Sequence, residues 1–163
     1  MIPKSDMYKD TVVSAIVSKE DVHKLLAKFN ITERRWTELS PDNTFLEFII
    51  RREGKPPLKI KINVPFVEKK QRGEKVHDEA RAFRFFYHYI KALLSAKDAE
   101  ITSIEEVFMA HITIPLPNGQ EITLGDQLTM MLESGNAPRL EGFNVVASEP
   151  ALPERKEIQL NEI

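Results

Sequence analysis

Two turn segments carry the residue types of the PD…ExK motif of metal-dependent nucleases: Pro41-Asp42 and Glu53-Gly54-Lys55. That chemistry needs both carboxylates on one Mg²⁺ ion, only a few ångströms apart. Residues 44–51 have the composition of a strand, and at about 3.3 Å per residue this strand puts Asp42 roughly 30 Å or more from Glu53. We therefore interpret both segments as turns.

The histidines do not have the spacing of a shared metal site. No two of them stand three or four residues apart, and a helical pair eleven residues apart is three turns apart. The four are His23, His77, His88 and His111. His111 follows Glu105 and Glu106 closely, so catalysis by these three residues would require them to converge in one pocket.

Other catalytic signatures are absent from the sequence. The chain has no cysteine, which excludes disulfides, thiolate ligands and cysteine nucleophiles. It has no G-x-S-x-G elbow, and its six glycines form no phosphate-binding cluster. We therefore expect a non-enzymatic protein without metal or cofactor.

Anion binding is the best positive case for chemistry. Residues 51–75 hold nine Lys or Arg against three Glu, whereas residues 97–163 hold twelve acidic residues against four basic ones. Several cations on one surface neutralise phosphates and so bind nucleic acid. The candidate nucleic-acid-binding residues are Arg51, Arg52, Lys55, Lys59, Lys61, Lys69, Lys70, Arg72, Arg81, Arg84 and Lys91. The alternative is that these cations pair with the acidic C-terminal half.

The pattern of apolar residues predicts the elements that position these cations. Residues 11–17 are β-branched and favour an extended segment, Ser18 favours the start of a helix, and Asn30 favours its end in a left-handed conformation. Apolar and polar residues alternate from Leu58 to Val64, so a strand there has one apolar and one polar face. Expected next are a helix at 19–29, strands at 33–39, 44–51 and 58–64, a charged loop at 68–75 and a helix at 76–97. Double-stranded-RNA-binding domains share this helix–three strands–helix order, an analogy of topology alone.

The expected helix 76–97 is apolar around more than half of its circumference. A helix of this kind is buried on two sides. It either lies at the centre of the domain or packs against a partner or a second copy. The alternative function is therefore a protein–protein interaction or homo-oligomeric assembly module, such as a homodimer, that packs through this helix.

The C-terminal half contains caps and a turn. Ser103 with Glu106 forms a capping box, Asn118-Gly119 between apolar runs predicts a hairpin, and Thr123 with Asp126 predicts the start of a last helix that ends near Gly135. Residues 144–163 contain two prolines and many charges, which favour a loosely held tail.

These observations together predict the fold class. We expect one α+β domain over residues 1–143, with a three-stranded antiparallel sheet, a long apolar helix packed on it, and a C-terminal hairpin and helix. Because no segment has the length and apolarity of a membrane span and cysteine is lacking, we expect a cytoplasmic protein without a membrane partner.

Most of the chain resembles a family of short bacterial proteins of unassigned function that occur in phage and mobile-element surroundings. The resemblance depends on capping and turn residues, and it implies a common fold without implying a reaction. The matching segments are Val13-Ser14, Ser18–Asp21, Leu25-Leu26, Ile90–Ala92, Ile101, Ser103–Glu106, Phe108, Ala110–Ile112, the Pro-Asn-Gly turn, Gly125, Ser134-Gly135 and Pro138.

Overall fold

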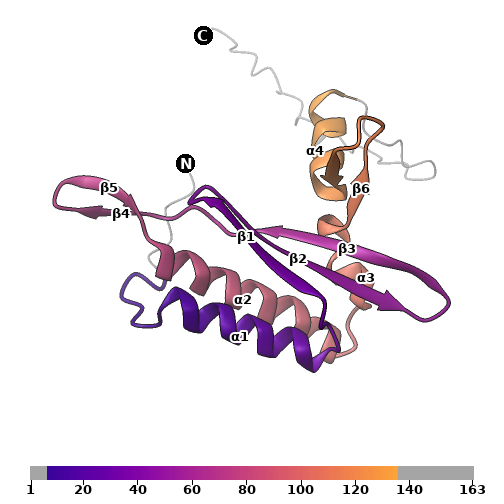
Figure 1. The fold of residues 1–163 in the computed structure, drawn as a ribbon, viewed down its shortest axis with the longest axis horizontal. Helices are drawn as coiled ribbons and strands as arrows, with labels where there is room; N and C mark the ends of the chain where they lie inside the picture. The colour runs from indigo at the N-terminus through magenta and orange to yellow at the C-terminus, as the bar shows by residue number, and fades with distance from the viewer. Residues whose placement is uncertain (1–6, 136–163) are drawn as a thin grey trace, which may run out of the picture.

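A three-stranded antiparallel sheet forms the centre of the molecule, and two helices cover one of its faces (Figure 1). The computed structural model describes residues 7–135, so the expected tail at 144–163 lies outside the described residues. The strands are β1 (Arg34–Ser40), β2 (Asn43–Arg52) and β3 (Lys55–Asn63), in the order β1-β2-β3. The expected α+β class is confirmed.

Alternation along β3 gives the sheet one buried and one open face. Ile60 and Ile62 are buried, whereas Lys59 and Lys61 point to the opposite face. In β2, Leu46 lies opposite Ile62, and Phe48 lies opposite Ile60, so the apolar side chains of neighbouring strands share the covered face.

The first helix, α1 (Ala15–Lys28), starts earlier than the sequence predicts. The Ser14 side chain caps it by accepting a hydrogen bond from the amide of Val17, and Ser18 is buried inside the helix. The expected extended segment at 11–17 is therefore wrong from Ala15 onward, because helix capping and packing override the β preference of branched residues. Asn30 ends the helix with φ +60°, as expected.

The expected charged loop at 68–75 is a second hairpin, β4 (Glu68–Gln71) with β5 (Glu74–His77). Arg72 and Gly73 both have positive φ, +51° and +86°, which matches a tight two-residue hairpin turn. The long helix α2 (Glu79–Asp98) consequently starts three residues later than predicted, where the Asp78 side chain accepts a hydrogen bond from the Arg81 amide.

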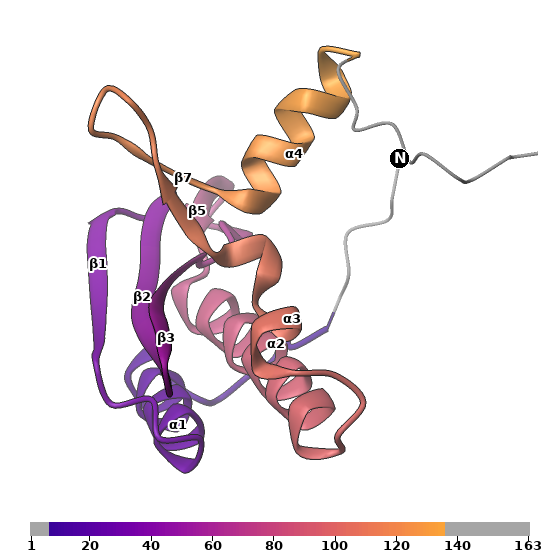
Figure 2. The same ribbon diagram turned by 90° about the vertical axis from the view of Figure 1, so that its right-hand side faces the viewer.

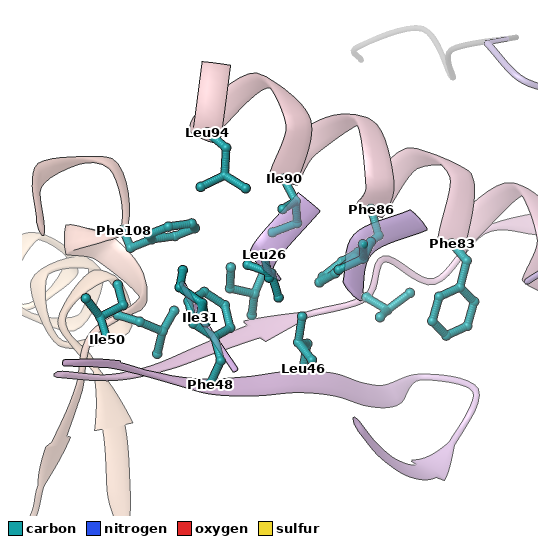
Figure 3. Close-up of a cluster of buried hydrophobic side chains, with 14 of the residues drawn as sticks. Leu26, Ile31, Leu46, Phe48, Ile50, Phe83, Phe86, Ile90, Leu94 and Phe108 are labelled. Atoms are coloured by element: carbon teal, nitrogen blue, oxygen red, sulfur yellow. The ribbon is translucent and has the colours of Figure 1, made fainter. Parts of the chain in front are cut away.

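The core lies between α2, α1 and the covered face of the sheet (Figure 3). Phe83, Phe86, Ile90 and Leu94 of α2 are buried. Because α2 meets the sheet on one side and α1 on another, contacts within the chain account for most of its wide apolar surface.

The remaining elements form a C-terminal unit, residues 104–133, which projects from the body (Figure 2). It comprises α3 (Ile104–Val107), a 3₁₀ turn (Met109–His111), the hairpin β6 (Thr113–Pro115) and β7 (Glu121–Thr123), and α4 (Leu124–Glu133). Phe108 anchors the unit in the core, where the centroid of its ring lies 5.2 Å from the centroid of the Phe48 ring. The predicted capping box, hairpin and Thr123 cap are confirmed.

Within residues 7–135, no helix has the length and apolarity to cross a membrane.

Candidate functional site

The predicted basic residues do not form one surface. The β2–β3 turn and the β4–β5 hairpin project at opposite ends of the molecule (Figure 1). The β2–β3 turn and its flanks carry Arg51, Arg52 and Lys55, and the β4–β5 hairpin carries Lys69, Lys70 and Arg72. Lys59 and Lys61 lie on the open face of β3, and the helix α2 carries Arg81, Arg84 and Lys91.

Most of these cations have partners within the chain. The ion pairs are Arg51–Glu33, Arg52–Glu105, Lys59–Glu47, Lys59–Glu121, Lys69–Asp78 and Arg84–Asp21. Arg81 is buried and donates to the carbonyl oxygen of Met7, whereas Lys61 lies over the ring of Phe45 and Lys91 near that of Tyr87. Lys55, Lys70 and Arg72 form no ion pair with any residue in 7–135.

The open face of the sheet carries an ion-pair network centred on Glu47. Its carboxylate accepts from Arg35 and lies 3.2 Å from Nζ of Lys59, which also contacts Glu121 of β7. Burial raises the pKa of Glu47, but the hydrogen bonds from Arg35 and Lys59 outweigh burial and leave the pKa below its ordinary value. The contact with Glu121 also raises the pKa of Lys59. Cations here are therefore largely neutralised.

An apolar pocket lies where α2 meets the C-terminal unit, and we call it the Tyr89 pocket. Its volume is about 560 Å³, and Glu106, His111 and Gln127 supply its polar side chains. The larger apolar residues that line it are Tyr89, Val107, Met109, Leu124, Leu128 and Met131. A pocket of this size with few polar groups is typical of a binding site.

A second apolar pocket, which we call the Phe85 pocket, adjoins the first across the Tyr89 side chain. Its volume is about 440 Å³, and it lies between α2 and the segment that follows β3. Its walls are Asn63, Pro65, Val67, Phe85, Phe86 and Tyr89. Tyr89 thus belongs to the walls of both pockets.

Local backbone contacts hold α4 beside the 3₁₀ turn. The Thr123 hydroxyl accepts from the amide of Asp126 at 3.1 Å, and the amide of Leu124 donates to the carbonyl of Ile112 at 2.9 Å. Gly125 lies so close to Ala110 that a Cβ atom at this position would stand 2.9 Å from the Ala110 carbonyl oxygen. The absent side chain at Gly125 thus permits the close approach that shapes the pocket.

The helix α4 buries none of its residues. Leu128, Met130 and Leu132 keep 46%, 61% and 57% of their surface exposed, and Met131 is also exposed. Apolar side chains that gather on one element without cover mark an interaction surface more often than a monomer's ordinary exterior.

A hydrogen bond joins the two walls of the Tyr89 pocket. The Tyr89 hydroxyl lies 2.7 Å from Nε2 of His111. Burial lowers the pKa of His111, although the nearby Asp126 carboxylate opposes the change, and burial raises the pKa of Tyr89. Both shifts favour the neutral pair.

The candidate catalytic residues do not converge. Glu106 and His111 line the same pocket, but the Glu106 carboxylate accepts from the Ser103 amide and the Thr102 hydroxyl within the capping box. Glu105 lies toward Arg52 instead. No group of three or more His, Asp or Glu residues within 7–135 is placed to hold a metal ion.

The sequence identifies Leu124, Leu128 and Met131 as apolar residues of a helix but not as walls of a pocket. The available signal is that α4 carries apolar residues at 128, 130, 131 and 132, more than one face of a short helix can bury.

Comparison of the chain with protein-family models, curated proteins and solved structures found no match. The family resemblance therefore stays a prediction.

Proposed function

We propose that this chain is a protein-interaction module whose docking surface is the Tyr89 pocket together with the open face of α4. The observation that carries the proposal is the helix itself, which has a defined cap and a close backbone contact but no buried side chain. Contact with a partner would remove the apolar side chains of α4 from water, which is the main favourable term in most protein association.

The long helix α2 contributes only a small part of this docking surface. Buried residues of α2 contact the sheet and α1 inside the same chain, and its residues that border the two pockets are Phe85, Phe86 and Tyr89. The partner surface is thus built mainly by α4 and the 3₁₀ turn, with α2 as one wall.

Selection of peptides from a random library against the immobilised chain tests this function. We expect selected peptides to lose at least about tenfold in affinity on Leu128→Glu or Met131→Glu, because a buried charge opposes docking. Ile16→Glu is the matched control, since Ile16 is exposed on α1, away from the pocket. Failure to select any peptide, or equal binding by all variants, would overturn the proposal.

A specific observation favours nucleic-acid binding as a second candidate function. Lys70 and Arg72 stand at the tip of the projecting β4–β5 hairpin, are exposed, and form no ion pair within the described part of the chain. Cations at such a tip could contact phosphates. We expect Lys70→Glu with Arg72→Glu to abolish low-salt retention of RNA or DNA in a gel shift, and absence of retention by the unaltered chain removes this candidate.

A further inference from the structure

The two edges of the central sheet differ in how they are covered. At one edge, β3 meets the C-terminal unit: Ile60 forms an isolated bridge with Ile112, and the Thr113 hydroxyl donates to the carbonyl of Lys59. At the other edge β1 is the outermost strand, and no strand within residues 7–135 pairs with its outer side (Figure 2). An open edge of this kind is a template for pairing with another chain.

The outer side of β1 presents its backbone groups in a fixed order. The amide of Ile49 donates to the carbonyl of Glu33 at 3.0 Å, so in this antiparallel ladder the next residue, Arg34, directs its own backbone groups away from β2. By alternation, the N–H and C=O groups of Trp36 and Glu38 also point outward. None of these outward groups has a hydrogen-bond partner among residues 7–135. A register shift after Glu38 ends the regular edge.

The strand β1 is complementary in charge to an antiparallel copy of itself. When Trp36 lies opposite Trp36 of a second copy, Arg34 lies opposite Glu38 of that copy, and Glu38 opposite its Arg34. This register also brings outward-facing backbone groups opposite one another, as an antiparallel ladder requires. A parallel pair in register would instead place like charges side by side, so the charges favour one direction and one register.

The side chains of Arg34 and Glu38 are available for these contacts. Arg34 forms no ion pair within the described part of the chain, and its Nη1 donates to the carbonyls of Ile31 and Thr32 at 3.0 and 3.4 Å, which leaves other guanidinium donors unused. The Glu38 carboxylate contacts Nζ of Lys19 at 2.6 Å, yet the side chain keeps 47% of its surface exposed. A carboxylate has room for a second cation in this setting.

We propose that two copies of this chain pair through β1, antiparallel about Trp36, and form a six-stranded sheet across a two-fold axis. The backbone groups of Arg34, Trp36 and Glu38 form the new ladder, and two Arg34–Glu38 ion pairs fix its register. Charged residues on an edge strand ordinarily discourage pairing, whereas opposite signs at mirror positions favour this one arrangement. The inference goes beyond the proposed docking function and does not depend on it, because β1 lies at the edge opposite the one that meets the C-terminal unit.

The size of the contact sets the expected affinity. A ladder from Arg34 to Glu38 is smaller than a standard interface, which buries about 800 Å² per partner. We therefore expect a reversible dimer with a dissociation constant in the micromolar range. The two Trp36 side chains become cross-strand neighbours in this dimer, so emission from the sole tryptophan reports its formation.

Sedimentation velocity of the full chain over a range of concentrations measures the association. We expect Arg34→Glu and Glu38→Arg each to weaken the dimer at least about tenfold at low salt, because each places like charges opposite one another on both sides of the axis. An equimolar mixture of the two variants should dimerise again, because the acidic β1 of one variant then lies opposite the basic β1 of the other. Glu74→Arg on β5, a charge reversal away from this edge, is the control and should leave the association unchanged.

Recovery in the mixture is the decisive result, since a variant that fails to fold cannot recover by mixing. Circular dichroism checks the fold of each variant, and Arg34→Gln, a milder change that keeps a donor for the Ile31 carbonyl, should still weaken the dimer severalfold.

Three results would overturn the inference. The first is a chain that stays monomeric up to millimolar concentration. The second is a dimer that Leu128→Glu dissociates and the β1 variants leave intact, because the second copy then occupies α4. The third is dissociation by both folded reversal variants without recovery in the mixture, which excludes the antiparallel register about Trp36.

Discussion

The Tyr89 hydroxyl lies 2.7 Å from Nε2 of His111 and so links the long helix α2 to the C-terminal unit across the pocket that both residues line. Elsewhere the unit contacts the body through Phe108 in the core, through the ion pairs Glu105–Arg52 and Glu121–Lys59, and through Ile112 and Thr113 beside β3. The hydrogen bond is therefore the polar contact most directly coupled to the shape of the docking surface.

We expect Tyr89→Phe to lower the free energy of unfolding by about 0.5–1 kcal/mol, because a partly exposed hydrogen bond is lost with little change in volume. Tyr87→Phe is the matched control, since the Tyr87 hydroxyl has no hydrogen-bond partner in the described region. Urea denaturation followed by circular dichroism measures both. A larger loss for the Tyr87 variant would contradict the role of the His111 contact.

A second prediction concerns pH and His23. The indole Nε1 of Trp36 donates to Nε2 of His23 at 2.8 Å, so this contact requires a neutral imidazole. Burial, helped by the charge of Arg34, lowers the pKa of His23 from 6.5. The unfolded chain therefore takes up the proton first, and stability present above pH 6.5 falls as the pH drops from there toward the folded-state pKa.

Fluorescence of Trp36, the sole tryptophan, reports this transition during urea denaturation at a series of pH values. We expect His23→Gln to make the acid loss of stability shallower, because the amide oxygen still accepts from Trp36 but does not titrate. The same substitution at His77, on β5, is the control. An unchanged slope in His23→Gln would show that other groups cause the acid sensitivity.

The third prediction concerns Gly125. Helix propensity alone would make Gly125→Ala stabilising by about 1 kcal/mol. The new Cβ would instead stand 2.9 Å from the Ala110 carbonyl oxygen, so α4 or the 3₁₀ turn must move. We expect a destabilisation of about 1–3 kcal/mol and faster hydrogen exchange in α4. Gln127→Ala is the control on the same helix, and a stabilised Gly125 variant would refute the close contact.

A fourth prediction concerns the ion-pair network on the open face of the sheet. Glu47→Gln removes the shared negative charge from between Arg35 and Lys59, and we expect a loss of about 1–3 kcal/mol. Glu38→Gln, which affects the exposed pair with Lys19, is the control and should cost less than about 1 kcal/mol. Comparable losses from both variants in urea denaturation would contradict a special role for Glu47.

The ion-pair network around Glu47 makes the stability of the folded chain decrease at acid pH. Because the folded-state pKa of Glu47 lies below 4.5, its contribution to stability is full above that pH and is lost as the pH falls through the folded-state pKa. We expect the difference in stability between the unaltered chain and Glu47→Gln to shrink in this acid range.

The sequence by itself determined the elements whose signals are local. Alternation from Leu58 to Ile62 predicted β3 and its faces, and Asn30, Ser103 and Thr123 marked helix boundaries that the structure confirms. A turn, a cap and a period of two residues depend on neighbours in the chain, so residue types suffice to predict them.

Tertiary structure decided the features that depend on distant segments. Whether Lys59 is free depends on Glu121, which stands 62 positions later in the sequence. The separation of the basic residues to opposite ends and the pocket between Tyr89 and Leu128 likewise arise from contacts between elements far apart in sequence. Residue types and spacing do not encode such distances, because packing of the whole chain decides which elements meet.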